Sequence, residues 1–191
     1  TRIMPDAVML FAAGLGTRMG NLTANCPKPL LKVSGRPLLD HALALADNAN
    51  VPRKVVNTHY LSEQIQQHLA TRTDVTVSDE QPELLETGGG LRNALPLLGL
   101  GPVFTLNTDA VWTGANPLTT LREAWDPERM DALLMLVAQE NARGHGGSGD
   151  FELGFEGRLS RGPGAIYSGA QILRIDGLGE IEQSVFSLNL L

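Results

Sequence analysis

A glycine-rich segment near the start of the chain has the residue types needed to bind a phosphate chain. In LFAAGLGTRMG, residues 10–20, an apolar run gives way to two alanines, two glycines, a threonine and an arginine. Glycines let backbone N–H groups approach phosphate oxygens closely, and several such donors together form an anion site. A second cation, Lys28, follows between Pro27 and Pro29, which restrict the backbone around it. The glycines alone would also suit a tight turn, but Arg18 and Lys28 favour a charged ligand.

Two common glycine motifs do not fit this segment. The dinucleotide fingerprint G-x-G-x-x-G would need a small residue at Met19, and no acidic residue follows the next predicted strand to bind a ribose. A P-loop would need its last glycine, with Lys-Ser/Thr behind it, five residues after Gly14, where Met19 stands. The pattern therefore disfavours a nicotinamide-dependent oxidoreductase and predicts another way of binding phosphate.

The elements that would position this segment alternate between strands and helices. Residues 7–12 form a continuous apolar run, typical of a strand covered on both faces. We expect further strands at 54–59, 75–79, 102–109, 131–138 and 165–175, and helices at 36–49, 61–70, 88–98 and 117–125. Such alternation predicts an α/β fold with a Rossmann-like, doubly wound and mostly parallel sheet. Residues 150–162 alternate around Glu156-Gly157, which predicts a small β-hairpin lid.

Composition narrows the functional classes. The 191 residues suit one domain, and the net charge of −6 argues against nucleic acid as a partner. No apolar run approaches the length of a membrane span, and a single cysteine, Cys26, excludes an internal disulfide and favours a cytoplasmic protein. The last residues, SVFSLNLL, end on an apolar run without a helix stop, and we interpret this as truncation.

Three motifs together resemble those of the sugar-1-phosphate nucleotidyltransferases. AAGLGTRM followed by PKPLL resembles the opening motif of that family, while LLETGGG (84–90) and LNTDAVW (106–112) resemble its second and third motifs, in the same order. Within the family, VVNTHYL and LLETGGG are most similar to the bacterial N-acetylmuramate α-1-phosphate uridylyltransferases. Mannose-1-phosphate guanylyltransferases are the nearest alternative.

The resemblance implies a reaction between a nucleoside triphosphate and a sugar 1-phosphate, giving a nucleotide sugar and pyrophosphate. The substrates would be UTP and N-acetylmuramate α-1-phosphate, or GTP and mannose 1-phosphate in the alternative. Such a reaction needs positioning and charge neutralisation and no protein nucleophile. A non-catalytic sensor of nucleotide sugars on the same fold is a further alternative, although a sensor would be free to lose the charged residues that this chain retains.

The resemblance also assigns roles at the nucleotide end, within residues 1–139. Arg18 would pair with the departing phosphates, Lys28 would reach the reacting phosphate, and Asp109 would bind Mg²⁺; from its position alone, Asp109 could instead cap the next turn. The three glycines of ETGGG would let a base or sugar pack against bare backbone, or would simply form a tight turn. The implied nucleotide-binding residues are Ala12, Ala13, Gly14, Leu15, Gly16, Thr17, Glu80, Glu86, Gly88 and Gly89.

The sugar end is expected within residues 140–191. Candidates there are Asp150, Tyr167 and Gly169, together with Asn107 from the third motif, although Tyr167 would equally suit the core. Relatives usually have a second metal-binding aspartate in a motif like DVGT, and no such motif occurs before Leu191. Either that ligand lies beyond the truncation or this version of the enzyme is impaired, and we expect the former.

Overall fold

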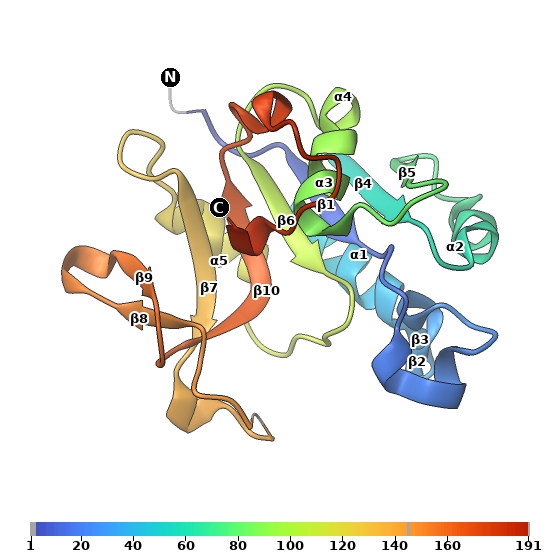
Figure 1. Ribbon diagram of the computed structural model, residues 1–191, viewed down its shortest axis with the longest axis horizontal. Helices are drawn as coiled ribbons and strands as arrows, with labels where there is room; N and C mark the ends of the chain where they lie inside the picture. Colours follow the sequence, from blue (N-terminus) through green and yellow to red (C-terminus); the bar gives the residue numbers. More distant parts are fainter. Residues whose placement is uncertain (1–2, 145, 191) are drawn as a thin grey trace.

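The core of the protein is a six-stranded sheet with the strand order β5-β4-β1-β6-β10-β7. The computed structural model describes residues 3–144 and 146–190. The first four strands in this order are parallel to one another, and β10 pairs antiparallel with both β6 and β7 (Figure 1). The strands are β1 (Ala7–Phe11), β4 (Arg53–Thr58), β5 (Val75–Asp79), β6 (Val103–Asn107), β7 (Ala132–Val137) and β10 (Ile166–Leu173). The predicted α/β class with a mostly parallel sheet is confirmed.

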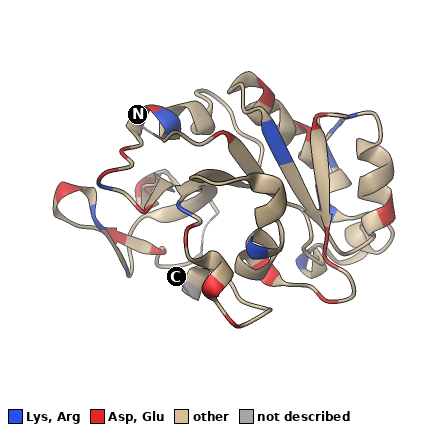
Figure 2. Ribbon diagram, turned by 90° about the horizontal axis from the view of Figure 1, so that it is seen from above, with Lys and Arg blue, Asp and Glu red and all other residues tan. Residues whose placement is uncertain are grey.

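Helices cover both faces of this sheet, and neighbouring side chains of β1, β4, β6 and β10 pack into two separate cores on its two sides. Val8 and Leu10 of β1 pack into one cluster with side chains from α1, α2 and α5, while Met9 packs into another with α3, α4 and the C-terminal segment. Charged residues lie mainly in loops and near the ends of elements (Figure 2). The α-helices are α1 (Leu38–Asn48), α2 (Ser62–Leu69), α3 (Glu86–Asn93), α4 (Leu95–Leu98) and α5 (Pro117–Ala124).

The pairing of the central strands brings three chain segments to one edge of the sheet. β1 lies between β4 and β6, and Phe11 at its end is in register with Asn57 on one side and Asn107 on the other. The loops that follow these three parallel strands therefore start side by side. This is the edge at which open α/β sheets bind ligands.

The expected helix at 88–98 is wrong in its bounds, because the structure has two helices there. α3 begins earlier, at Glu86, and α4 is a separate short helix with Pro96 in its first turn. Proline has no N–H to donate to the preceding turn, so a continuous helix through this position is disfavoured.

Smaller elements complete the fold. The predicted hairpin is present as β8 (Phe151–Leu153) and β9 (Leu159–Arg161), which project from the main sheet beside β7 (Figure 1). β2 (Lys32–Val33) and β3 (Arg36–Pro37) form a second small sheet. Short 3-10 helices span Thr17–Thr23, Lys28–Leu30, Gln139–Asn141, Phe155–Gly157, Leu178–Glu180 and Leu188–Leu190. In the part of the chain that the structure describes, no helix has both the length and the apolar character to cross a bilayer.

The start of α5 generates a stability prediction. The side chain of Asn116 accepts a hydrogen bond from Leu118 N at 3.0 Å and donates one to Leu45 O at 2.8 Å. We expect Asn116→Ala to lower the free energy of unfolding by about 1 kcal/mol, because a helix cap is lost. Urea denaturation measures this, with Glu123→Ala on the exposed face of α5 as the control. Equal stability of the two variants would contradict it.

Candidate active site

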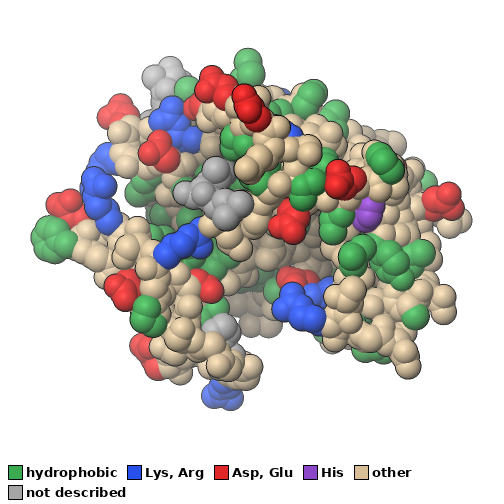
Figure 3. All heavy atoms as spheres, in the orientation of Figure 1, with side chains coloured by type: hydrophobic (Ala, Val, Ile, Leu, Met, Phe, Trp, Pro, Cys, Tyr) green, Lys and Arg blue, Asp and Glu red, His purple; other side chains and the backbone are tan. Residues whose placement is uncertain are grey.

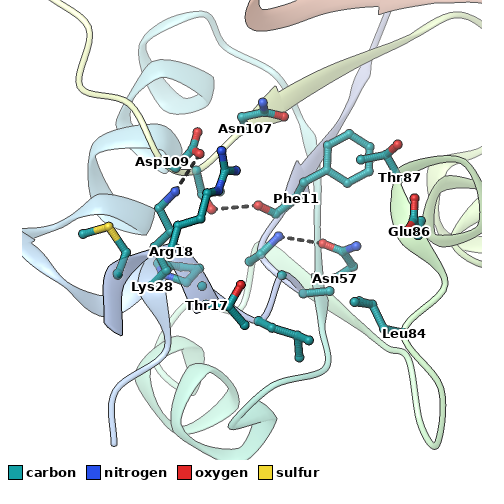
Figure 4. Close-up of a pocket in the computed structure, with 18 of the residues that line it drawn as sticks. Phe11, Thr17, Arg18, Lys28, Asn57, Leu84, Glu86, Thr87, Asn107 and Asp109 are labelled. Carbon is teal, nitrogen blue, oxygen red and sulfur yellow. Dashed lines mark hydrogen bonds and ion pairs between the residues drawn. The ribbon is translucent and has the colours of Figure 1, made fainter. Parts of the chain in front are cut away.

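A cleft of about 570 Å³ lies at the carboxyl edge of the sheet. Its residues come from the ends of β1, β4 and β6, from the start of α3 and from the C-terminal segment (Figure 4). The lining residues are Phe11, Ala12, Ala13, Gly14, Leu15, Gly16, Thr17, Arg18, Met19, Lys28, Pro29, Asn57, Leu84, Glu86, Thr87, Asn107, Thr108, Asp109 and Ser187. Figure 3 shows a face of the molecule that is hollowed near its centre, with side chains of both charge signs around the hollow.

The glycine loop follows β1 and is held in a fixed shape by Gly16. Gly16 has a φ of +64°, and a Cβ there would lie 3.0 Å from Thr23 Cγ2 and 3.3 Å from Lys28 Cβ. Its carbonyl accepts hydrogen bonds from Met19 N at 2.9 Å and from Thr23 Oγ1 at 2.9 Å. A side chain at this position would be strained and would push the Lys28 segment away. The expected nucleotide-binding residues Ala12 to Thr17 all line the cleft.

The three charged residues expected to be catalytic lie in this one cleft. Lys28 Nζ is 2.8 Å from Asp109 Oδ2, and the two side chains are 25% and 42% exposed. Figure 4 shows the Arg18 side chain extending along the same side of the cleft toward Asp109. The turn that carries Asp109 is fixed to β1, because Thr108 Oγ1 donates a hydrogen bond to Phe11 O at 2.7 Å. Two cations and one carboxylate thus lie together beside the glycine loop.

Glu80 is not among the residues that line the cleft, contrary to its expected contact with the nucleotide. Its side chain is only 2% exposed and accepts hydrogen bonds from Asn57 Nδ2 at 2.6 Å and from Leu85 N at 3.0 Å. Burial raises the pKa of Glu80, while the hydrogen bonds from Leu85 and Asn57 act in the opposite direction. Sequence reasoning placed this residue close to the ligand because a loop position does not reveal which way the side chain turns.

The glycines of ETGGG also have a different surrounding from the expected one. A Cβ on Gly88 would collide with the ring of Phe186, and a Cβ on Gly89 would collide with the carbonyl of Ser184. Both amide groups donate to Phe186 O, at 2.9 and 3.0 Å. The C-terminal segment therefore packs where a base or sugar was expected, and neither glycine lines the cleft. Glu86, by contrast, does line it.

A second and larger cavity of about 1250 Å³ lies next to the first. It is bordered by β7, the β8–β9 hairpin and β10, and Tyr167 is among its lining residues. Both cavities are lined by Phe11, Thr87, Asn107 and Ser187, so they are continuous. Burial raises the pKa of Tyr167 above its usual range.

Two of the expected sugar-binding residues have other contacts. The carboxylate of Asp150 accepts a hydrogen bond from Tyr167 N at 2.8 Å and so holds β10 beside the hairpin. Gly169 has a φ of +91°, and a Cβ there would lie 2.8 Å from Asn107 Nδ2. Neither lines either cavity, and Gly169 instead leaves room for the Asn107 side chain, which lines both.

Several cleft residues were missed by sequence reasoning. Asn57 had a usable signal, because it is a polar residue inside the apolar stretch KVVNTH at the carboxyl end of a predicted strand. Thr108 lies within a recognised motif but was given no role, whereas Thr87 falls in the stretch from Glu86 to Gly89 that was expected near the nucleotide and sugar. Ser187 had no signal, since it is brought to the cleft only by the return of the C-terminal segment to α3, where Leu188 N donates to Thr87 Oγ1 at 2.9 Å.

Comparison with known proteins identifies the family to which the chain belongs. Residues 8–146 match the model of the MobA-like NTP transferase domain. The chain belongs to this family of nucleotidyltransferases. It is 43% identical over 162 residues to the N-acetylmuramate α-1-phosphate uridylyltransferase of Caulobacter vibrioides, covering 80% of this chain and 66% of that protein. It is 37% identical over 183 residues to the enzyme of the same name from Neisseria meningitidis serogroup B, covering 91% of this chain and 78% of that protein.

A solved structure shares the fold of this nucleotidyltransferase domain. HddC from Yersinia pseudotuberculosis superimposes with a TM-score of 0.76 at 22% identity, over 96% of this chain and 83% of that one. The family and the fold expected from the motifs are confirmed.

The packing of the C-terminal segment on α3 generates a stability prediction. We expect Gly88→Ala to lower the free energy of unfolding by about 1–3 kcal/mol, because the added methyl group must displace the Phe186 ring. Chemical denaturation measures the change. The matched control is Gly179→Ala, where an added Cβ meets nothing within 4 Å, and its effect should stay within about 0.5 kcal/mol. A Gly88→Ala protein as stable as the control would contradict this packing.

Proposed function

We propose that the protein transfers a nucleotidyl group from a nucleoside triphosphate to a sugar 1-phosphate and releases pyrophosphate. The observation that carries this proposal is the single cleft in which the glycine loop, Arg18, Lys28 and Asp109 meet, continuous with a larger cavity. The names of the two curated relatives support UTP and N-acetylmuramate α-1-phosphate as the substrates. GTP with mannose 1-phosphate is the alternative pair.

In this proposal the two cavities hold the two substrates. The backbone of the glycine loop binds the triphosphate, and Arg18 pairs with the phosphates that leave as pyrophosphate. An oxygen of the sugar phosphate attacks the α-phosphorus from the side of the larger cavity, in line with the departing group. Lys28 offsets the charge that gathers at the α-phosphorus. No side chain acts as a nucleophile.

We further propose Mg²⁺ as the metal ion, with Asp109 as its protein ligand. Mg²⁺ is typically bound by one or two carboxylates and completes its shell with water and substrate phosphates, so a single carboxylate at the cleft mouth fits it. Among the described residues there is no group of three or more His, Cys, Asp or Glu side chains suited to hold a metal without the substrate. When bound, the ion supplies Lewis-acid stabilisation of phosphate charge. Asn107 lines the same cleft and could hold the sugar or support the ligand shell.

Pyrophosphate release tests the reaction directly. We expect UTP with N-acetylmuramate α-1-phosphate to give the highest rate in a panel that crosses UTP, GTP, CTP and ATP with several sugar 1-phosphates. Phosphate-free sugars serve as the control, because they lack the phosphate group whose oxygen is proposed to attack. Absence of pyrophosphate from every pair would refute the proposal, while a higher rate with GTP and mannose 1-phosphate would favour the alternative.

Substitution of the carboxylate tests its assigned role. Asp109→Asn should lower kcat by on the order of 100-fold or more, because a group that holds charge at the reacting phosphorus is lost. Chelation of divalent ions should abolish the activity of the wild type, and added Mg²⁺ should restore it. Asp176→Asn is the control, since Asp176 pairs with Arg174 outside both cavities. Equal rates for the two variants would exclude Asp109 from the reaction.

A further inference from the structure

Two buried side chains connect the glycine loop to the segment before α3. Asn57 Oδ1 accepts a hydrogen bond from Ala12 N at 2.7 Å, and Asn57 Nδ2 donates one to Glu80 Oε1 at 2.6 Å. The second oxygen, Glu80 Oε2, accepts from Leu85 N at 3.0 Å. Asn57 is 3% exposed and Glu80 is 2% exposed. A continuous series of hydrogen bonds thus runs beneath the cleft from one loop to the other.

The hydrogen-bonding partners at positions 57 and 80 determine which type of side chain each position can hold. Leu85 N and Asn57 Nδ2 are both donors, so the residue between them must accept at both of its oxygens, as a carboxylate does. Asn57 must accept from Ala12 N and donate to Glu80, which an amide does. The surroundings are shaped for this arrangement, because a Cβ on Gly90 would collide with Glu80 Oε1. The third glycine of ETGGG therefore makes room for the carboxylate.

The two ends of the series belong to different walls of the cleft. Ala12 begins the glycine loop, whereas Leu85 lies between Leu84 and Glu86, which line the opposite side (Figure 4). Glu80 is further fixed to β4, because Glu80 N donates a hydrogen bond to Thr58 O at 2.8 Å. A buried donor that loses its acceptor is costly, so neither wall can shift without breaking a bond of the series.

We propose that Glu80 is a positioning residue that acts through Asn57 and Leu85 to hold the two walls of the nucleotide cleft in one relative geometry. The identity of the ligand in this statement rests on the proposed function, whereas the coupling of the walls does not. Glu80 itself touches no substrate. Because the two walls are already held together, binding of the nucleotide does not have to order each wall separately, and the free-energy cost of binding is lower.

Reciprocal substitution separates this role from simple packing. Glu80→Gln places an amide nitrogen opposite the Asn57 amide or the Leu85 amide, so two donors face each other. Asn57→Asp places two carboxylates together. The double variant Asn57→Asp/Glu80→Gln restores every bond, because the new carboxylate at position 57 accepts at both of its oxygens, while the new amide at position 80 donates to it and accepts from Leu85 N. Size and net charge of the pair are also unchanged.

Amide hydrogen exchange in the ligand-free protein tests the coupling without any assumption about the substrate. Glu80→Gln should raise the exchange rates of the Ala12 and Leu85 amides by about tenfold, and the double variant should return them to the wild-type rates. Asn116→Ala is the control, since it removes a helix cap outside both cavities and should leave these two amides unchanged relative to the rest of the chain. Unchanged rates in Glu80→Gln, or no recovery in the double variant, would overturn the coupling.

Calorimetric titration with UTP, and in parallel with GTP, then tests the effect on the ligand. Glu80→Gln should weaken binding of the preferred triphosphate by about tenfold with little change in the KM for the sugar phosphate. The double variant is tested by hydrogen exchange alone, because it places a negative charge at position 57, which lines the cleft. A merely structural residue would resemble Asn116→Ala, with lower stability and unchanged affinity. That result for Glu80→Gln would overturn the positioning role. Failure of the wild type to bind either nucleotide would refute the proposed function, while the exchange rates would still decide whether the walls are coupled.

Discussion

The parallel pairing of β1 with β4 and β6 is the constraint on which the rest of the site depends. In this register Phe11 lies between Asn57 and Asn107, so three chain segments that are far apart in sequence leave the sheet at the same level. The glycine loop then follows from β1, the buried amide from β4, and the carboxylate of Asp109 from the turn after β6. A shift of one residue between any two of these strands would turn the polar side chains to the opposite face of the sheet. The position of the cleft residues is therefore set first by the register of the strands and only then by the conformation of the loops.

Glycines near the cleft serve three different physical purposes. Gly16 provides a left-handed backbone that lets the Thr23 and Lys28 segments pack closely, Gly88 and Gly89 admit the C-terminal segment, and Gly90 admits the carboxylate of Glu80. Only the first purpose concerns the loop expected to hold phosphate. A run of glycines beside a ligand site is thus no sign that each one faces the ligand, because close approach by another part of the chain requires the same absence of a side chain.

The fold could be predicted closely from the sequence, and the site in part. Apolar runs gave the strands, with 75–79 matching β5 in both bounds, because the sheet is covered on both faces and its strands are short and distinct. The sequence could place the glycine loop, Arg18, Lys28 and Asp109 in one cleft, because their motifs follow strands that end at the same edge of the sheet. The orientation of Glu80 and the cover on Gly88 were not found, since both depend on contacts between distant segments. Thr87 and Leu188, for example, are 101 residues apart along the chain.

A buried and a partly exposed polar pair lie at the cleft, and the two differ in how strongly they are held. The Asn57–Glu80 pair is shielded from water, so its loss would leave unpaired polar groups in the interior. The Lys28–Asp109 pair is partly exposed, and such pairs contribute only about 0–1 kcal/mol. It can therefore hold two opposite charges in place while no ligand is bound. In the proposed function, it would separate readily when a triphosphate offers several negative charges to Lys28. Under the proposed coupling, the buried pair holds the walls in place while the partly exposed charged residues rearrange around the ligand.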